Sequence, residues 1–159
     1  SFMRSIDEFL NEYGKTHRNR HNQLIHFVCV PVILISSLAF GWPLSMAMLG
    51  SEAAWAPYVN VAAVASVLML AAFYSRLGWR AVAAMVVFLG VSIAVIMAVE
   101  SSPLPLIWTA VVAWIAAWVV QLIGHNIEGA KPSFLDDLVF LLIGPLFVLE
   151  EWGVPLRTK

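Results

Sequence analysis

Charged residues are scarce in this chain of 159 residues, because Lys, Arg, Asp and Glu together make up only 12% of it. Soluble domains carry about 25% charged residues. Hydrophobic residues account for 61% of the chain, and a soluble fold of this size would have to hide more apolar surface than its volume allows. Lipid is the easier solvent, so the composition predicts an integral membrane protein.

Several other features are absent, and each absence excludes something. Cys29 is the one cysteine, which excludes an intrachain disulfide. The net charge is −1 and the chain has no basic tract, so nucleic acid is not an expected partner. The first two dozen residues are polar and charged, so no cleavable signal peptide is expected. No internal repeat divides the sequence, and residues 1–159 are expected to form a single membrane domain.

The chain does contain apolar runs that are long enough to cross a bilayer. A crossing needs about 20 mostly apolar residues, because the hydrocarbon core is about 30 Å thick and a helix rises about 1.5 Å per residue. Four runs qualify, at about residues 24–49, 53–74, 81–99 and 103–124. A fifth, shorter apolar run, Leu138–Leu149, contains Gly144 and Pro145, and a short helix is expected over about 134–150. The predicted fold is all-α: an integral membrane helical bundle with four transmembrane helices plus a short interfacial or re-entrant C-terminal helix.

Lysine and arginine alternate between the ends of these predicted spans. The first and third loops have neither residue, whereas the other connecting segments are basic. Positive charge favours the cytoplasmic side, which predicts a cytoplasmic N-terminus, in a bacterial inner membrane or in the endoplasmic reticulum of a eukaryote. The basic positions are Arg4, Lys15, Arg18 and Arg20 before the first span, Arg76 and Arg80 in the second loop, and Lys131 after the fourth span.

Histidines from both ends of the chain are expected to meet at this cytoplasmic face. His17 and His26 flank the entry to the first span, and His125 follows the fourth. His125 and Glu128 are three residues apart, so they share a helix face, and imidazole with carboxylate suits a divalent transition metal. His17 and His26 are nine apart, about half a turn out of phase on one helix. Both can bind one ion only if the chain bends between them, for example at residues 18–20.

Structural explanations for the same residues remain open at this stage. A histidine at the headgroup level is often only a polar group, which is our interpretation of His21. Glu128 could lie in a solvated turn. Arg18 and its basic neighbours could simply set topology and contact anionic lipid. Trp114 and Trp118, one turn apart in the fourth span, are more typical of packing than of a site.

Two sequence blocks resemble a known family. Residues 13–31 read Y-G-K-T-H-R-N-R-H-N-Q-L-I-H-F-V-C-V-P, and residues 121–138 read Q-L-I-G-H-N-I-E-G-A-K-P-S-F-L-D-D-L. They resemble the signatures of the small membrane proteins typified by the fungal 2-hydroxy-fatty-acid (2-hydroxypalmitate) dioxygenase. Arg20 stands where that family commonly has proline, and His21 is not part of its pattern. The matching positions are His17, Arg18, Asn19, Asn22, His26, Pro31, Gly124, His125, Glu128 and Pro132.

The resemblance implies an iron(II)-dependent dioxygenase that shortens 2-hydroxy long-chain fatty acids by one carbon. Its partners would be the 2-hydroxy fatty acid, dioxygen and membrane lipid. On this hypothesis Asn22 donates a hydrogen bond that orients His26, and Arg18 binds the substrate carboxylate. Glu128 would be a fourth metal ligand or a base. The metal ligands would be His17, His26 and His125.

Two other classes of function stay open. The same ligands suit zinc, so a zinc-dependent membrane lipid hydrolase is an alternative. A small transporter with histidine relays is a further one, although the span interiors lack the ionisable residues that a conduction path usually needs. A homo-oligomer is compatible with either class.

Overall fold

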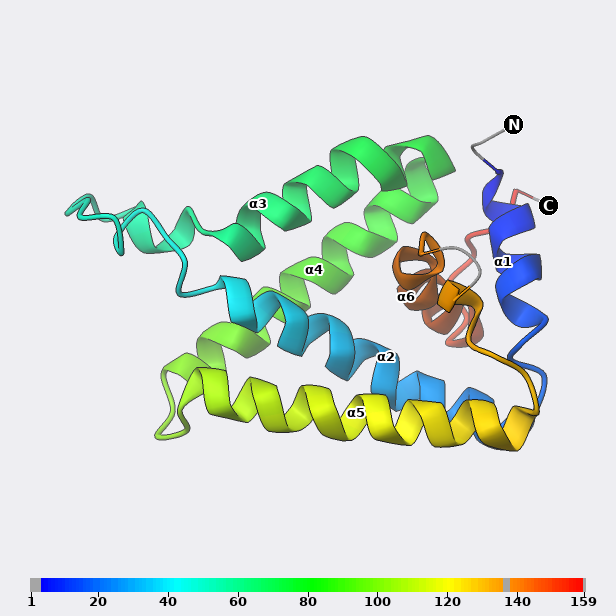
Figure 1. Cartoon of the computed structure of the whole chain (residues 1–159). Helices are drawn as coiled ribbons and strands as arrows, with labels where there is room; N and C mark the ends of the chain where they lie inside the picture. Colours follow the sequence, from blue (N-terminus) through cyan, green and yellow to red (C-terminus); the bar gives the residue numbers. More distant parts are fainter. Residues whose placement is uncertain (1–3, 136–137, 159) are drawn as a thin grey trace.

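The computed structural model describes residues 4–135 and 138–158, and Figure 1 shows an all-helical arrangement. One isolated bridge between Ser45 and Asn60 is the β-type pairing in that part of the chain. The predicted all-α class is therefore confirmed. In chain order the helices are α1 (Ile6–Gly14), α2 (Arg20–Gly41), α3 (Val61–Leu68) with its continuations η2 (Met69–Phe73) and η3 (Tyr74–Leu77), α4 (Trp79–Glu100), α5 (Leu106–Glu128) and α6 (Phe140–Glu151).

Among the described residues, three helices are long and apolar enough to cross a membrane: α2, α4 and α5. Helix length therefore supports three of the four predicted spans. The span predicted at 53–74 corresponds to a shorter apolar helix, Val61–Leu77. It starts late because Pro57 lies in a turn and Asn60 caps the helix, its Oδ1 accepting from the backbone N–H of Ala63 at 2.9 Å.

The first predicted span is displaced toward the N-terminus. α2 begins at Arg20, where the Asn19 side chain accepts a hydrogen bond from the His21 backbone N–H at 2.9 Å. It ends at Gly41 rather than near Leu49. Pro43 explains the earlier end, since proline has no backbone N–H with which to continue the helical hydrogen bonds beyond Trp42. The prediction of helix over residues 42–49 is wrong.

An amphipathic helix, α1, precedes the spans. Ile6, Phe9, Leu10 and Tyr13 are buried at helical spacing along one face. The helix starts with a capping box, in which the Ser5 side chain accepts from the Glu8 backbone and the Glu8 carboxylate accepts from the Ser5 backbone. α1 thus packs its apolar face onto the bundle and leads directly to His17.

α6 is covered mainly by protein. Its residues from Ile143 to Leu149 are all buried, and it packs against α1, α2 and α4. A helix that is apolar all round belongs in an interior. The predicted C-terminal helix at 134–150 is present over Phe140–Glu151, preceded by a separate 3-10 turn, η4 (Ser133–Leu135), while residues 136–137 lie outside the described part.

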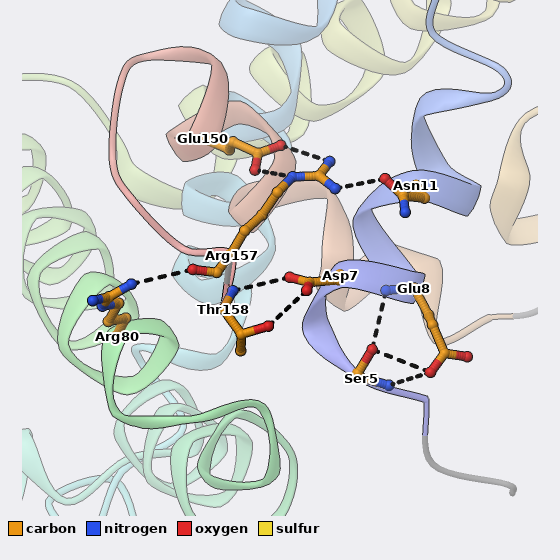
Figure 2. Close-up of polar contacts among 8 residues, drawn as sticks. All are labelled: Ser5, Asp7, Glu8, Asn11, Arg80, Glu150, Arg157 and Thr158. Atoms are coloured by element: carbon orange, nitrogen blue, oxygen red, sulfur yellow. Dashed lines mark hydrogen bonds and ion pairs between the residues drawn. The ribbon is translucent and has the colours of Figure 1, made fainter.

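The C-terminal segment fastens α1 to α6 (Figure 2). The Arg157 guanidinium donates to both carboxylate oxygens of Glu150, at 2.5 and 3.2 Å, and to Asn11 Oδ1 at 2.5 Å. The backbone N–H and hydroxyl of Thr158 donate to the Asp7 carboxylate at 3.1 and 2.6 Å. Isolated surface ion pairs contribute little, but these contacts bridge α1 to the rest of the bundle.

α2 and α5 lie side by side and antiparallel along most of their length (Figure 1). The start of α2 therefore faces the end of α5, and α1 and α6 pack at the same end of the bundle. This arrangement brings His26 near His125 although they are 99 positions apart in sequence.

Candidate metal centre and adjoining cavity

Three imidazoles converge where α1, α2 and α5 meet. Each offers one nitrogen, and these nitrogens all lie within 4.8 Å of one another. The ring centroids are 4.1 to 4.9 Å apart and the ring planes are almost perpendicular, at 81° to 87°. All three rings are buried, which keeps water from competing for their nitrogens. They belong to His17, His26 and His125.

The outer nitrogens of two rings are held by backbone carbonyls. His17 Nδ1 lies 2.7 Å from the Tyr13 carbonyl oxygen, and His26 Nδ1 lies 3.0 Å from the Asn22 carbonyl oxygen. A carbonyl only accepts, so both Nδ1 atoms carry the proton and both Nε2 atoms keep a lone pair. These Nε2 atoms are 2.8 Å apart. A divalent cation would satisfy lone pairs that face each other in this way.

His125 completes the donor set. Its Nδ1 is buried and has no hydrogen-bond partner among the described residues. A buried nitrogen without a partner is uncommon in folded proteins, and a bound metal ion would supply one here. The residues present therefore fit a metal ion held by three neutral imidazoles.

His17 is kept neutral by its surroundings. Burial, followed by the neighbouring His26 ring, lowers the pKa of His17 far below its ordinary value of 6.5. The ring also stacks on Tyr13, with centroids 4.1 Å apart and planes 3° from parallel. Metal binding requires deprotonated imidazole, so His17 needs to release no proton at neutral pH.

The chain breaks between His17 and His26, as the nine-residue spacing requires. α1 ends at Gly14 and α2 begins at Arg20. The intervening turn rotates His17 so that its ring can face His26. The predicted bend at residues 18–20 overlaps the end of this turn.

Glu128 holds that turn rather than joining the imidazole group. The group of three nitrogens within 4.8 Å does not include its carboxylate. Glu128 Oε1 accepts from the Asn19 backbone at 2.8 Å and from Asn22 Nδ2 at 3.1 Å, and Oε2 accepts from the Arg18 backbone at 3.1 Å. Three N–H groups already donate hydrogen bonds to this carboxylate. Glu128 therefore links the end of α5 to the turn before α2 and to the start of α2.

The structure also shows which contacts Asn22 makes and where Arg18 lies. The Asn22 side chain donates to Glu128 and to the Thr16 carbonyl at 3.1 Å, so His26 contacts the Asn22 backbone and not its amide. Arg18 is exposed and lines a polar surface cavity with Lys15. His21 is exposed and lies outside the imidazole cluster.

An apolar cavity of about 320 Å³ starts at the imidazoles. Along α5 it extends from His125 to Trp114, a rise of about 16 Å at 1.5 Å per residue. The volume lies at the lower end of the range for small-molecule sites, about 300 to 1,000 Å³. Trp114 and Leu141 line it and are 37% and 46% exposed, so the cavity reaches the surface of the bundle. Its walls also include Tyr13, His17, Val30, Leu34, Trp118, Gln121, Phe134, Phe140 and Pro145.

Sequence reasoning missed three features of this site. Gln121 was not singled out, although it is an amide inside an otherwise apolar run and lies one turn before His125. Trp118 was interpreted as packing, yet it lines the cavity. Tyr13 was noted only as part of a motif, and the structure stacks it on His17. A polar side chain inside an apolar span was the available signal for Gln121.

These observations define a class: a helical bundle suited to a membrane, with three buried imidazoles and an adjoining apolar cavity at one end. Residues 3–154 match the family model described as 2-hydroxy-palmitic acid dioxygenase Mpo1-like, and the chain belongs to this family. The resemblance inferred from the two sequence blocks is thereby confirmed. The family's name implies a dioxygenase that acts on a 2-hydroxy fatty acid. Comparisons with curated proteins and with solved structures returned no match.

Proposed function

We propose that this protein is an iron(II)-dependent dioxygenase that shortens 2-hydroxy long-chain fatty acids by one carbon at the cytoplasmic face of a membrane. The observation that carries the proposal is the junction of a buried three-imidazole cluster with an apolar cavity, at His17 and His125. Family membership supports the substrate class and the reaction.

The donor set suits the proposed metal. Imidazole binds iron and zinc alike, and three protein ligands leave coordination positions open for other molecules. When bound, reduced iron would supply the redox chemistry that activates dioxygen toward closed-shell carbon. His17, His26 and His125 would hold it. Glu128 and Asn22 would keep His17 and His26 in position, because they hold the turn before α2.

The cavity orients the fatty acid more than it attracts it. An acyl chain arrives from a bilayer that is already apolar, so burial between helices adds little hydrophobic free energy. Fixing the chain along α5 places its polar head beside His17 and His125, and such positioning lowers the barrier of the chemical step. Because Arg18 lies on the polar surface and does not line this cavity, we assign it to the charged surface rather than to the carboxylate.

A four-span topology with a cytoplasmic N-terminus fits this site. The start of α2 and the end of α5 meet in one cluster, so the chain crosses the membrane an even number of times between them. α2, α4 and α5 supply three crossings. Val61–Leu77, about 25 Å long at 1.5 Å per residue, then supplies the return.

The test is oxygen-dependent turnover by the purified full chain. Protein is prepared anaerobically, loaded with Fe²⁺ or Zn²⁺, and given 2-hydroxy-palmitic acid with and without dioxygen. We expect a product one carbon shorter only with Fe²⁺ and dioxygen, and loss of that product in His125→Ala but not in the exposed control His21→Ala. Iron-loaded protein that consumes no dioxygen and forms no shorter acid would refute the proposal.

Zinc remains the specific alternative, because three histidines without a carboxylate also form catalytic zinc sites. The same experiment separates the two. A zinc-dependent lipid hydrolase would work unchanged under argon, with a lipid ester as substrate, and would not need iron.

A further inference from the structure

Two buried polar atoms on the cavity wall lack partners. The amide oxygen of Gln121 and the indole nitrogen of Trp118 have no hydrogen-bond partner among the described residues. Both residues line the apolar cavity, and Gln121 is only 5% exposed. Trp118, Gln121 and His125 follow one another at spacings of three and four, so they share one face of α5.

Two serines and Trp114 on the wall of the same cavity are already paired. The Ser37 hydroxyl accepts from Trp114 Nε1 at 3.2 Å, and the Ser133 hydroxyl pairs with that of Thr16 at 2.7 Å. Native proteins seldom leave buried polar atoms unpaired without a reason. Among the fully buried side-chain atoms that line this cavity in the described part of the chain, the two without a partner, apart from His125 Nδ1, lie one and two turns along α5 from His125.

The hydrogen-bonding character of these two atoms identifies what they would bind. Gln121 Oε1 accepts and Trp118 Nε1 donates. A carboxylate only accepts, so it would repel the Gln121 oxygen. A hydroxyl both donates and accepts, so a single hydroxyl can satisfy both atoms. We propose that Gln121 and Trp118 bind the 2-hydroxyl group of the fatty acid and select hydroxylated over unsubstituted chains. This inference rests on the proposed function.

The selection would come from the polar pair and not from the apolar walls. The walls contact both kinds of chain equally, since the two differ by one oxygen atom. A site built to hydrogen-bond a hydroxyl rejects the analogue that lacks it, because its own polar groups then stay unpaired. An acid without the hydroxyl would leave both Gln121 Oε1 and Trp118 Nε1 buried and unsatisfied.

The test measures binding to metal-free full-length protein in lipid nanodiscs, so it does not depend on turnover. Displacement of a fluorescent fatty acid gives the affinities of 2-hydroxy-palmitic acid and palmitic acid. We expect wild type to prefer the hydroxy acid by about tenfold or more. Gln121→Leu and Trp118→Phe should each reduce the preference to about threefold or less, with palmitic acid binding unchanged. Trp108→Phe is the matched control, because Trp108 lies on α5, is 70% exposed and does not line the cavity.

Three results would overturn the inference. One is a wild-type protein without preference, and another is a preference that survives both substitutions. The last is an equal loss of affinity for both acids, which would show that the pair binds the carboxylate. If Gln121→Leu fails to fold, Trp118→Phe still tests the inference, because it preserves an aromatic ring. A hydroxyl preference without turnover would refute the proposed function and leave this inference intact.

Discussion

Gly124 offers a sharp test of how the imidazoles are held in place, because no side chain fits there. A Cβ at this position would lie 2.5 Å from Asn22 Oδ1 and 3.3 Å from two atoms of Ile25. Ordinary contact begins at 3.4 Å, so α2 and α5 would have to separate by about 0.9 Å or the Asn22 side chain would have to turn away. Turning is costly, since that amide bonds both Thr16 and Glu128.

We expect Gly124→Ala to weaken metal binding by about ten- to a hundredfold, the usual cost of disturbing groups that position metal ligands. The shift would move His26 relative to His125. Overpacking costs about 1 to 3 kcal/mol, and alanine's higher helix propensity returns about 1 kcal/mol, so global stability should change by no more than about 2 kcal/mol. A ten- to hundredfold loss of affinity corresponds to about 1.4 to 2.7 kcal/mol of binding free energy, so metal binding should weaken while the protein stays folded.

Gly90→Ala is the matched control. Gly90 is exposed on α4, and a Cβ there would meet no described atom within 4 Å. This variant should be as stable as wild type or more so, by up to about 1 kcal/mol. The assay is a Co²⁺ or Zn²⁺ titration against a chelating dye, with thermal unfolding measured in the same detergent. Wild-type affinity in Gly124→Ala would show that the close contact of α2 and α5 does not set the ligand geometry.

Three further predictions concern the cluster itself. His26→Ala and His125→Ala should lose stoichiometric metal by elemental analysis while His21→Ala keeps it; equal loss in all three would place the metal elsewhere. Glu128→Gln should keep its metal but unfold more easily, by about 1 to 3 kcal/mol, because it weakens charge-assisted hydrogen bonds; loss of metal with unchanged stability would make Glu128 a ligand. Burial keeps the folded-state pKa of His17 below 6.5, so the unfolded chain takes up the proton first on acidification. The His17 ring should therefore leave the stability of metal-free protein unchanged above about pH 6.5 and contribute a loss of up to about 1.4 kcal/mol per pH unit below it; the same slope in wild type and His17→Gln would contradict this.

Much of the fold can be predicted from the sequence, because long runs of apolar residues are typical of helices in lipid. The ends of the helices are harder to predict. Pro43 ends α2 early, and its effect was hidden inside a hydrophobic run that continues to Leu49. α1 was not predicted, although Ser5 and Glu8 have capping-box spacing. Its buried face of four residues is short, and it is held by contacts with α6 rather than by propensity alone.

The candidate site was predictable in composition but not in geometry. The charge pattern and the number of apolar runs predicted that His17, His26 and His125 would meet, and the structure places the three rings together. Spacing could not show that the Glu128 carboxylate accepts hydrogen bonds from backbone N–H groups more than 100 positions away. Nor could it show which face of α5 lines a cavity, because α5 is apolar around most of its circumference and carries little amphipathic signal.

The cluster is assembled by long-range contacts, and this makes metal binding and helix packing depend on each other. His17 comes from a turn clamped by Glu128, and His26 and His125 come from helices whose spacing Gly124 permits. An unfolded chain would not present three imidazoles to one ion, so metal should bind the packed bundle far more tightly. At a free metal concentration one hundred times the Kd, the folded state should gain about 2.7 kcal/mol, seen as a higher Tm in wild type and no shift in His125→Ala. An equal shift in both proteins would show that the ion binds outside the three histidines.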